Sequence, residues 1–511
     1  MKKIILLLLF SPVTVLAQMW PWGVRGGGFD SNSTNIETVL SLVTDSQKNV
    51  YAMCRMGYSG VTIAGQSIPS LGDPGTKEDL LLVALDCSGN LRWTKTIGGG
   101  GVEFVGKLAV DTQDNIYVAV TVTSCVPAVG DPNYPGYFGS YSFDNTYEAC
   151  NTNALVKLDT NGNMLWIQRP QPDVDDTLSV QSATFGLIRS DDGILHWLMR
   201  LPEGVYANGQ YTVPPSSNKW HILKYDDNGN FISGMPLDIF VEVVPGVQFY
   251  RNPYNGHYFF CEYRDLENPV SFGGNAITGS SFLASYDAAG NFLWVRESTE
   301  GQVGCVYFHG LDFDSQNNIY IGGVLTNTIG NASFIGFTIP PTEFQRTFVM
   351  KTNPTAENVI WAHYSNRFGD LRAVCKMFNN ELYWAGHGGG TVNWSGQSFQ
   401  VATSNNGNRH FAAKFNKDTG ACTGGFWIPS PQGGANYFTA MAQDASGDMI
   451  LGGEFTGTIV VNNNVGIASV GGLSDFIIAK YANQACSPLS LDELPFEQAQ
   501  LYPNPVTDEL A

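Results

Sequence analysis

The chain has 511 residues, of which 27 are Lys or Arg and 46 are Asp or Glu, giving a formal net charge of −19. Only 14% of the residues are charged, whereas 43% are apolar, 12% are aromatic and 57 are glycines. This composition argues against a coiled coil, a charge-rich disordered chain and a basic nucleic-acid-binding protein. It is typical of an all-β protein with many turns and aromatic-rich strands.

Residues 1–17 have the form of a secretory signal peptide. Lys2 and Lys3 precede an apolar run from Ile4 to Phe10, and Val15-Leu16-Ala17 provides a small-residue cleavage site. The apolar run is too short to span a bilayer, and the rest of the sequence has no longer apolar stretch. The sequence therefore predicts an exported protein without a membrane span.

The nine cysteines are too few for a disulfide scaffold, and no CxxC pair indicates a metal site. Cys125 and Cys150 flank a long insertion, residues 126–149. A disulfide that closes this loop and two unpaired thiols are equally compatible with the sequence. The cysteines that we treat as isolated are Cys54, Cys87, Cys261, Cys305, Cys375 and Cys422.

Two hairpin patterns recur along the chain. The first places an Asp-containing turn before a strand, as in Asp45–Cys54, Asp111–Val120, Asp314–Gly323 and Asp444–Gly453. The second joins two strands through a turn rich in Asp, Asn and Gly, as in Leu82–Trp93, Leu155–Trp166, Ile222–Ser233, Phe282–Trp294, Val349–Trp361 and Ala412–Trp427. Alternating apolar residues predict strands with one buried face. In the turn DTNGN we expect Asp159 to cap the backbone amides and Gly162 to have a positive φ.

The copy number predicts the architecture. The positions equivalent to Tyr117 are Tyr51, Leu195, Tyr258, Tyr320, Tyr383 and Ile450. Successive intervals are 66, 78, 63, 62, 63 and 67 residues, and the longest contains the insertion. Seven units with two hairpins each predict an all-β, seven-bladed β-propeller with four-stranded blades over residues 18–481.

The chain ends predict how this ring closes. The seventh unit runs through Asp475–Tyr481 without a fourth strand, whereas Met19–Gly28 resembles the fourth strand Leu91–Gly100. We therefore expect the N-terminal strand to complete the last blade, which would pair both open edges. The alternative, an unrelated Trp-rich tail, would leave one blade a strand short. Either Trp20 or Trp22 could take the Trp position of the repeat.

Over about residues 18–481 the units resemble the bacterial β-propeller repeats known as SBBP. That family's pattern runs F-x-A-K-x-D-x-x-G-N-x-x-W, then a Gly cluster, then D-x-x-x-N-x-Y-x-x-G. Its Lys is matched by Lys157, Lys224, Lys351, Lys414 and Lys480, and its Asp by Asp86, Asp159, Asp226 and Asp287. Ala84, Ser285, Asn353 and Asn416 depart from the pattern. The resemblance implies the same propeller fold.

Leu501–Leu510, after a linker of residues 482–500, resembles the opening of a type IX secretion C-terminal sorting domain. On this interpretation residues 501–511 are the start of a truncated sorting domain, and the alternative is a flexible Pro-containing tail. The resemblance implies recognition by the type IX export machinery. It places the protein outside a Gram-negative bacterium, either secreted or on the cell surface.

We find no catalytic motif among the sequence patterns, and the seven histidines are scattered over different units. The recurrent tryptophans are expected to pack between blades rather than to bind sugar, and they are Trp93, Trp166, Trp294, Trp361 and Trp427. The Asp/Asn-rich turns are expected to be capped hairpins, with Ca²⁺ binding as the alternative. No other cofactor is predicted.

The remaining candidate site is the channel. Its innermost strands are expected to include Asn35–Asp45 and Gly101–Asp111, which place Glu37 and Glu103 at equivalent positions near one channel mouth. Two carboxylates there could serve acid–base chemistry or hold a cation, although solvated rim charges are the simpler interpretation.

These features predict a non-catalytic binding or scaffold module for an extracellular protein or glycan, with the insertion at 126–149 as its contact region. The first alternative is an extracellular polysaccharide hydrolase or lyase with its site at the channel mouth. The second is a purely structural envelope component.

Overall fold

The structure is a computed structural model. It describes residues 19–483 and 486, apart from 29–35, 72–77, 100, 102, 124–134, 144–150, 171–182, 216–219, 242–246, 265–267, 299–305, 327–332, 341–344, 367–371, 402–406, 432–433, 462–464 and 472. The signal segment, residues 501–511, Cys125 and Cys150 lie outside the described residues, so these predictions stay predictions. Within the described ranges, no helix is long and apolar enough to cross a membrane.

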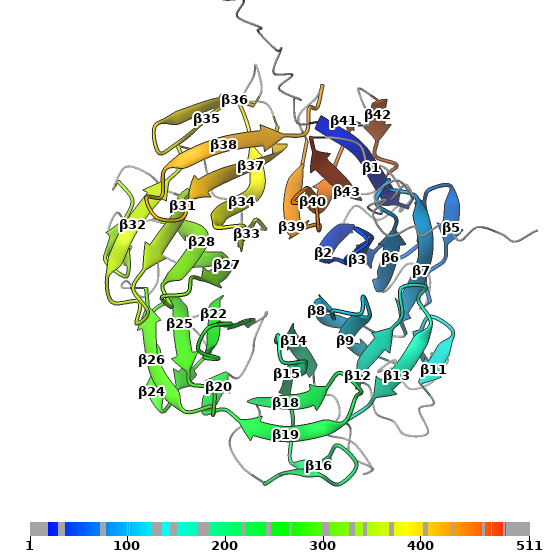
Figure 1. Ribbon diagram of the computed structural model, residues 1–511, viewed down its shortest axis with the longest axis vertical. Coiled ribbons are helices and arrows are strands. Elements are labelled where there is room, and N and C mark those ends of the chain that lie inside the picture. Colours follow the sequence, from blue (N-terminus) through cyan, green and yellow to red (C-terminus); the bar gives the residue numbers. More distant parts are fainter. Residues whose placement is uncertain are drawn as a thin grey trace, which may run out of the picture.

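The strands form antiparallel sheets arranged radially around a central opening, as in a β-propeller (Figure 1). In pairing order, the first sheet contains β2 (Thr38–Thr44), β3 (Val50–Met56), β6 (Asp79–Leu85) and β7 (Leu91–Gly98). The second contains β8 (Phe104–Val110), β9 (Ile116–Thr123), β12 (Asn151–Leu158) and β13 (Met164–Gln168). The third contains β14 (Ala183–Arg189), β15 (Ile194–Arg200), β18 (Trp220–Asp226) and β19 (Phe231–Pro236).

The remaining sheets continue around the ring in chain order (Figure 1). They are β21 (Gln248–Arg251), β22 (Tyr258–Tyr263), β25 (Ser281–Tyr286) and β26 (Phe292–Glu297); β27 (Val306–Phe313), β28 (Ile319–Thr326), β31 (Gln345–Thr352) and β32 (Val359–Tyr364); β33 (Val374–Phe378), β34 (Glu381–Gly388), β37 (Arg409–Asn416) and β38 (Cys422–Trp427); and β39 (Tyr437–Gln443), β40 (Met449–Phe455), β43 (Asp475–Ala482) and β1 (Met19–Gly27). The strand that comes first within each sheet lies nearest the opening.

The last of these sheets contains both ends of the described chain. Strand β1 (blue) lies beside β43 (brown) in Figure 1 and pairs with it in an antiparallel ladder. Trp22 lies opposite Lys480, as Trp166 lies opposite Lys157 in the second sheet. Trp22, and not Trp20, therefore occupies the Trp position of the repeat.

A further set of short hairpins, which we did not predict, connects the second and third strands of the sheets. They are β4 (Val61–Ile63) with β5 (Gln66–Ile68), β10 (Gly136–Phe138) with β11 (Tyr141–Phe143), β16 (Gly204–Tyr206) with β17 (Tyr211–Val213), β23 (Val270–Phe272) with β24 (Asn275–Ala276), β29 (Ser333–Phe334) with β30 (Phe337–Thr338), β35 (Thr391–Trp394) with β36 (Gln397–Gln400), and β41 (Thr458–Val461) with β42 (Val465–Ala468). Strand β20 (Ile239–Val241) pairs with β23.

Two of these hairpins extend the outer edge of the preceding sheet. Strand β4 pairs with β1, and β10 pairs with β7. Several turns use two residues of positive φ, such as Ile335 (53°) with Gly336 (74°), which matches the twist of a tight hairpin. The described part of the insertion at 126–149 is thus a structural hairpin, and it buries Phe138 and Phe143.

The tryptophan of one sheet contacts the turn of the next sheet. The indole N–H donates to a turn carbonyl in four copies: Trp22 to Cys87 (2.9 Å), Trp93 to Thr160 (3.0 Å), Trp166 to Asp227 (3.3 Å) and Trp361 to Lys417 (3.1 Å). Gly162 has the expected positive φ of 80°, and a Cβ there would lie 2.9 Å from the Trp93 ring. Packing against the next sheet is therefore confirmed for Trp93, Trp166 and Trp361, and Trp22 makes the same contact.

The Asp side chains cap the turns as expected. In the turn after β6, Asp86 Oδ1 accepts hydrogen bonds from the amides of Ser88 and Asn90, each at 2.9 Å. Asp159 accepts the equivalent amide bonds from Asn161 (2.9 Å) and Asn163 (2.8 Å). These hydrogen bonds hold the turns in the observed conformation.

The Asp of the first hairpin pattern also explains why Lys and Tyr recur at fixed positions of the repeat. Asp111 Oδ2 accepts hydrogen bonds from the Tyr117 hydroxyl (2.9 Å) and from Lys157 Nζ (3.1 Å), and Asp314 is held in the same way by Tyr320 and Lys351. Burial alone would raise the pKa of Asp111, but its hydrogen bonds with Asn115, Tyr117 and Lys157 lower that pKa to about 2. The three chain positions thus form one buried polar contact within a sheet.

Two details of the sequence alignment were wrong by one residue. The structural equivalents of Tyr117 are His196 and Phe259, not Leu195 and Tyr258, because His196 lies opposite Lys224 and Phe259 lies opposite Ser285. In the first case the apolar Leu195 was aligned with Tyr117, because a polar residue was not expected at this position. His196 occupies it instead, and its Nε2 lies 3.0 Å from Ser190 Oγ.

Cys87 is not isolated, as we had assumed, but forms a disulfide with Cys486, 399 residues away in sequence. Cys87 lies in the turn after β6, and Cys486 follows β43, so the bond joins the sheet containing β1 to the sheet containing β2. The indole of Trp22 donates to the carbonyl of the same Cys87. Cysteine spacing could not reveal this pair, because only the fold brings the two segments together.

Candidate functional site

The centre of the ring holds a cavity of about 420 Å³. Its lining comes from all the innermost strands, β2, β8, β14, β21, β27, β33 and β39. These strands include the two segments predicted to line the channel, which form β2 and β8. A volume of this size is within the range of small-molecule sites.

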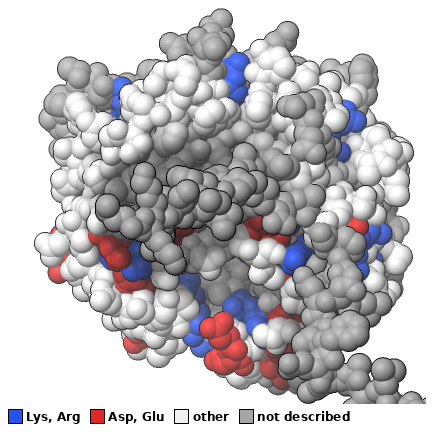
Figure 2. Space-filling view, turned by 45° about the horizontal axis from the view of Figure 1, so that its top comes forward, with Lys and Arg blue, Asp and Glu red and all other residues white. Residues whose placement is uncertain are grey.

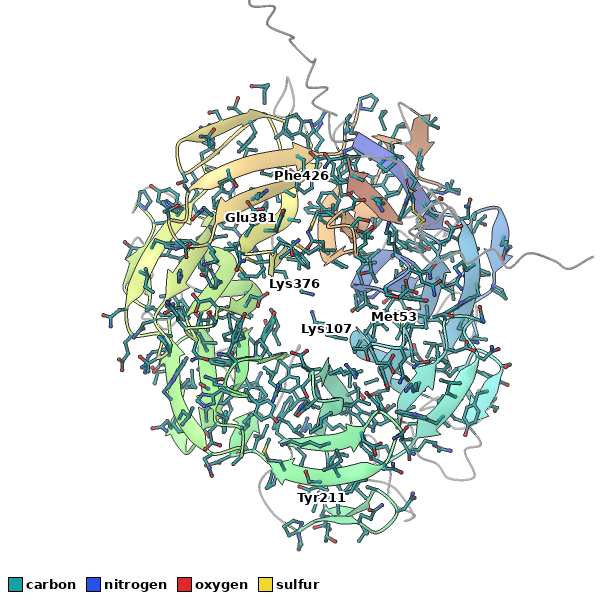
Figure 3. The ribbon with its side chains drawn as sticks, viewed as in Figure 1. Met53, Lys107, Tyr211, Lys376, Glu381 and Phe426 are labelled. Atoms are coloured by element: carbon teal, nitrogen blue, oxygen red, sulfur yellow. A yellow bond between two sulfur atoms is a disulfide. The ribbon has the colours of Figure 1, made fainter. Side chains whose placement is uncertain are left out.

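Four cationic side chains line this cavity, namely Lys107, Arg189, Arg251 and Lys376. Lys107 extends from β8 and Lys376 from β33, and Figure 3 shows both side chains projecting into the opening toward one another. Both are exposed to the channel although protein surrounds them on every side. Desolvation lowers the pKa of each, and the positive charge of Lys376 lowers the pKa of Lys107 further. Within the described part of the chain, neither ammonium group takes part in an ion pair or hydrogen bond.

The carboxylate nearest to this pair is already bound by the backbone. Asp312 lies next to Lys376 in the lining and attracts it electrostatically. Its Oδ2 accepts the amide of Met377 at 2.8 Å, and its Oδ1 accepts the amide of Phe313 at 2.9 Å. Burial raises the pKa of Asp312, and these two amides act in the opposite direction. One carboxylate thus faces two ammonium groups.

Two other polar groups of the lining have partners within the protein. Arg189 makes a bidentate contact with Asp227, with Nε–Oδ1 2.8 Å and Nη2–Oδ2 2.6 Å. The Tyr250 hydroxyl donates to Gln248 Oε1 (2.7 Å), and burial raises the pKa of Tyr250 well above its usual value. Apolar side chains complete much of the wall, namely Leu40, Leu108, Leu187, Ile188, Val374 and Met441. The cavity is therefore apolar with a positive centre, although the whole chain is acidic.

A second cavity, of about 430 Å³, lies at one rim between β2 and β39. It shares Leu40 and Thr439 with the central cavity, so the two adjoin. Arg372 forms an ion pair there with the buried Glu454, and its guanidinium lies 5.3 Å from the Tyr437 ring centroid. Figure 2 shows acidic and basic side chains close together around the hollow of one face of the molecule.

The two predicted carboxylates lie elsewhere. Glu37 is only 3% exposed, and its carboxylate accepts the amides of Gly28 (3.2 Å) and Gly57 (3.3 Å). Burial and, secondarily, the charge of Asp79 raise the pKa of Glu103 well above its usual value. Neither carboxylate is among the described residues that line the channel cavity.

The sequence analysis overlooked Lys107 and Lys376. Each lies in an otherwise apolar inner strand, FVGKLAV (Phe104–Val110) and VCKMF (Val374–Phe378). The available signal was a single Lys in a strand expected to line the channel. Whether that side chain points into the channel depends on how the strand is placed in the ring.

No protein-family model matches this sequence, and no curated protein matches it either. Solved structures with a similar arrangement include three of quite different description. Quinohemoprotein alcohol dehydrogenase from Comamonas testosteroni is 10% identical, with coverage of 93% of this chain and 78% of that chain and a TM-score of 0.36. The WD40 β-propeller domain of Doa1 is 7% identical, with coverages of 92% and 97% and a TM-score of 0.38. The polysaccharide lyase Uly1 is 10% identical, with coverages of 90% and 92% and a TM-score of 0.46. At these values no activity transfers to this chain.

Proposed function

We propose that this chain is an exported β-propeller that acts as a non-catalytic binding module outside a Gram-negative bacterium, with its ligand in the central channel. The observation that carries the proposal is the cavity of about 420 Å³, to which all the innermost strands contribute. A rigid ring of sheets holds such a cavity open at little conformational cost, because its walls are ordered before the ligand arrives. Export rests on the signal-like residues 1–17 and on the resemblance of residues 501–511 to a sorting domain.

We further propose that the ring has seven blades and is closed by β1. Three contacts support closure: the β1–β43 ladder, the Trp22 indole on the Cys87 carbonyl, and the Cys87–Cys486 disulfide. On the inner side, the Thr439 hydroxyl of β39 donates to the Val39 carbonyl of β2 at 2.6 Å. The first and last sheets are thus joined at their inner and outer edges, as neighbouring blades of a closed ring would be.

Binding to glycan and protein arrays by the mature chain tests this function. We expect a specific set of ligands to bind the wild-type protein and to be lost from Leu40→Trp, because Leu40 lines both cavities and a larger side chain would fill their junction. Val465→Trp, at an exposed position on the outer hairpin β41–β42, is the matched control and should bind as wild type. Failure of the wild type to bind any array member, or full binding by Leu40→Trp, would contradict the proposal.

A second candidate function is polysaccharide cleavage at the rim cavity. It is favoured by the Arg372–Glu454 pair, the Tyr437 ring beside it and Arg55 in the same lining. Such a set could bind an acidic sugar and supply a proton-transfer group. Incubation with a panel of acidic polysaccharides, followed by measurement of new reducing ends and of absorbance from unsaturated products, tests it. Cleavage that is lost in Tyr437→Phe and in Glu454→Gln would replace the non-catalytic proposal.

A further inference from the structure

The two channel lysines face each other with an incomplete set of counter-charges. Lys107 and Lys376 come from strands on different sides of the opening and extend toward each other (Figure 3). Two ammonium groups in a protein-walled space repel one another more strongly than they would in bulk water. An opposite charge placed between the two ammonium groups would offset this repulsion. The arrangement therefore favours any anion that can enter.

The protein itself supplies little of this compensation. Asp312 is the adjacent carboxylate, and it is engaged by the amides of Met377 and Phe313. Asp227 is engaged by Arg189 through two hydrogen bonds. His309, also in the lining, accepts the Trp384 indole N–H on Nδ1 at 2.9 Å and carries no negative charge. Among the described lining residues the positive charge thus exceeds the negative.

The walls restrict the type of anion. Leucine, isoleucine, valine and methionine side chains form much of the lining, and they offer no hydrogen bonds to a hydrated inorganic ion. They favour a ligand with an apolar body, because burying that body contributes about 25 cal/mol per Å² of apolar area. A cavity of about 420 Å³ suits a small molecule and not a folded partner. The adjoining rim cavity provides a route toward solvent.

We propose that the channel binds a small organic carboxylate, with its negative charge between Lys107 and Lys376 and its apolar body against the leucine-rich wall. This inference rests on the proposed binding function and names the ligand class of the same channel. Lysine suits this role as a compact cation with several donors, and a hydrogen bond to a charged group is among the stronger single contacts in proteins. The net charge of the chain is −19, so the protein as a whole is not expected to attract anions, and selective carboxylate binding would point to the two lysines.

Isothermal titration calorimetry with named probes tests the proposal. We would titrate adipate, hexanoate and benzoate into the mature chain, with adipamide as the uncharged analogue and sulfate as the inorganic anion. At least one carboxylate should bind saturably, and it should bind at least ten-fold more tightly than sulfate or adipamide. Lys107→Met and Lys376→Met keep the side-chain bulk and should each weaken carboxylate binding about ten-fold or more. Lys417→Met, at a surface lysine paired with Asp418, is the control and should bind as wild type.

A measurement without ligand guards against misfolded variants. Removing one of two facing cations relieves repulsion, so ligand-free Lys107→Met and Lys376→Met should melt no lower than the wild type. The inference is overturned if no carboxylate binds, if sulfate binds equally well, or if binding survives in both variants. Array ligands that bind wild type and Lys107→Met alike, in a protein that binds no carboxylate, would overturn this inference and leave the binding function standing. Carboxylate binding without array binding would leave this inference standing and would exclude only the protein and glycan ligands of the arrays.

Discussion

The contact of Trp22 with the first sheet gives a sharp prediction about how the ring holds together. Trp22 is 6% exposed, and its indole N–H donates to the Cys87 carbonyl at 2.9 Å. A Cβ at Gly89 would lie 2.7 Å from its ring, so the indole lies against that turn. Trp22→Ala removes both the packing and the hydrogen bond between the sheet containing β1 and the sheet containing β2.

The expected loss follows from burial. Truncation of a buried Trp to Ala costs about 3–5 kcal/mol of unfolding free energy. Trp22→Phe keeps most of the ring contact and loses the N–H donor, and it should therefore cost about 1 kcal/mol for the hydrogen bond. The matched control is Trp93, which makes the same contact with Thr160 between the first and second sheets. Trp93→Ala and Trp93→Phe should show losses similar to those of the Trp22 variants.

Urea unfolding followed by far-ultraviolet circular dichroism measures these losses without relying on tryptophan fluorescence. Both pairs of variants should be measured with the disulfide intact, so that Cys87–Cys486 is equal in all samples. If Trp22→Ala unfolds at the wild-type midpoint while Trp93→Ala is destabilised, β1 does not contribute to the ring as described, and the reasoning fails.

Three further changes test other parts of the fold. Gly162→Ala should lower the free energy of unfolding by about 1–3 kcal/mol more than Gly396→Ala, because both positions have a positive φ (80° and 84°) but only Gly162 lies against a tryptophan ring. Equal losses for the two variants in urea titrations would contradict this. Asp111 has a pKa of about 2 against an ordinary value of 3.8, so its ionised form contributes about 2 kcal/mol to the free energy of unfolding above pH 3.8, and this contribution is lost as the pH falls toward 2. Across this range the urea midpoint should fall less in Lys157→Met than in the wild type, and an identical pH profile in the two proteins would refute the contact. Cys87→Ser should lower the unfolding free energy by about 2–5 kcal/mol, and a calorimetric melting temperature equal to that of the wild type would argue against the disulfide.

Much of the fold is local in origin, which is why the sequence could predict it. The turn Asp159–Asn163 adopts its capped conformation through contacts within five residues, and alternating apolar residues then define the strands on either side. Repetition adds the order in which the units follow one another, because each unit buries its faces only against its neighbours. The resemblance of Met19–Gly28 to other fourth strands was enough to predict the pairing with β43.

Features without a repeated or sufficiently long sequence pattern were not predictable. Cys87 and Cys486 are 399 residues apart, and no spacing rule connects them. The outer hairpins were missed because strands as short as β4 have too few residues for a clear alternation. The pairing of Lys107 with Lys376 exists only because the fold places β8 and β33 on different sides of the same opening. Glu37, by contrast, was predicted to lie near the channel mouth, and its carboxylate accepts hydrogen bonds from two backbone amides.

The pairing of the cysteines tests most directly whether the two ends of the chain complete one ring around the channel. Digestion of the unreduced, alkylated protein and mass spectrometry of its peptides would identify every disulfide present. The account predicts a linked pair of peptides containing Cys87 and Cys486 that separates on reduction. Recovery of Cys87 as an alkylated thiol, or in a bond with another cysteine, would contradict the closed ring.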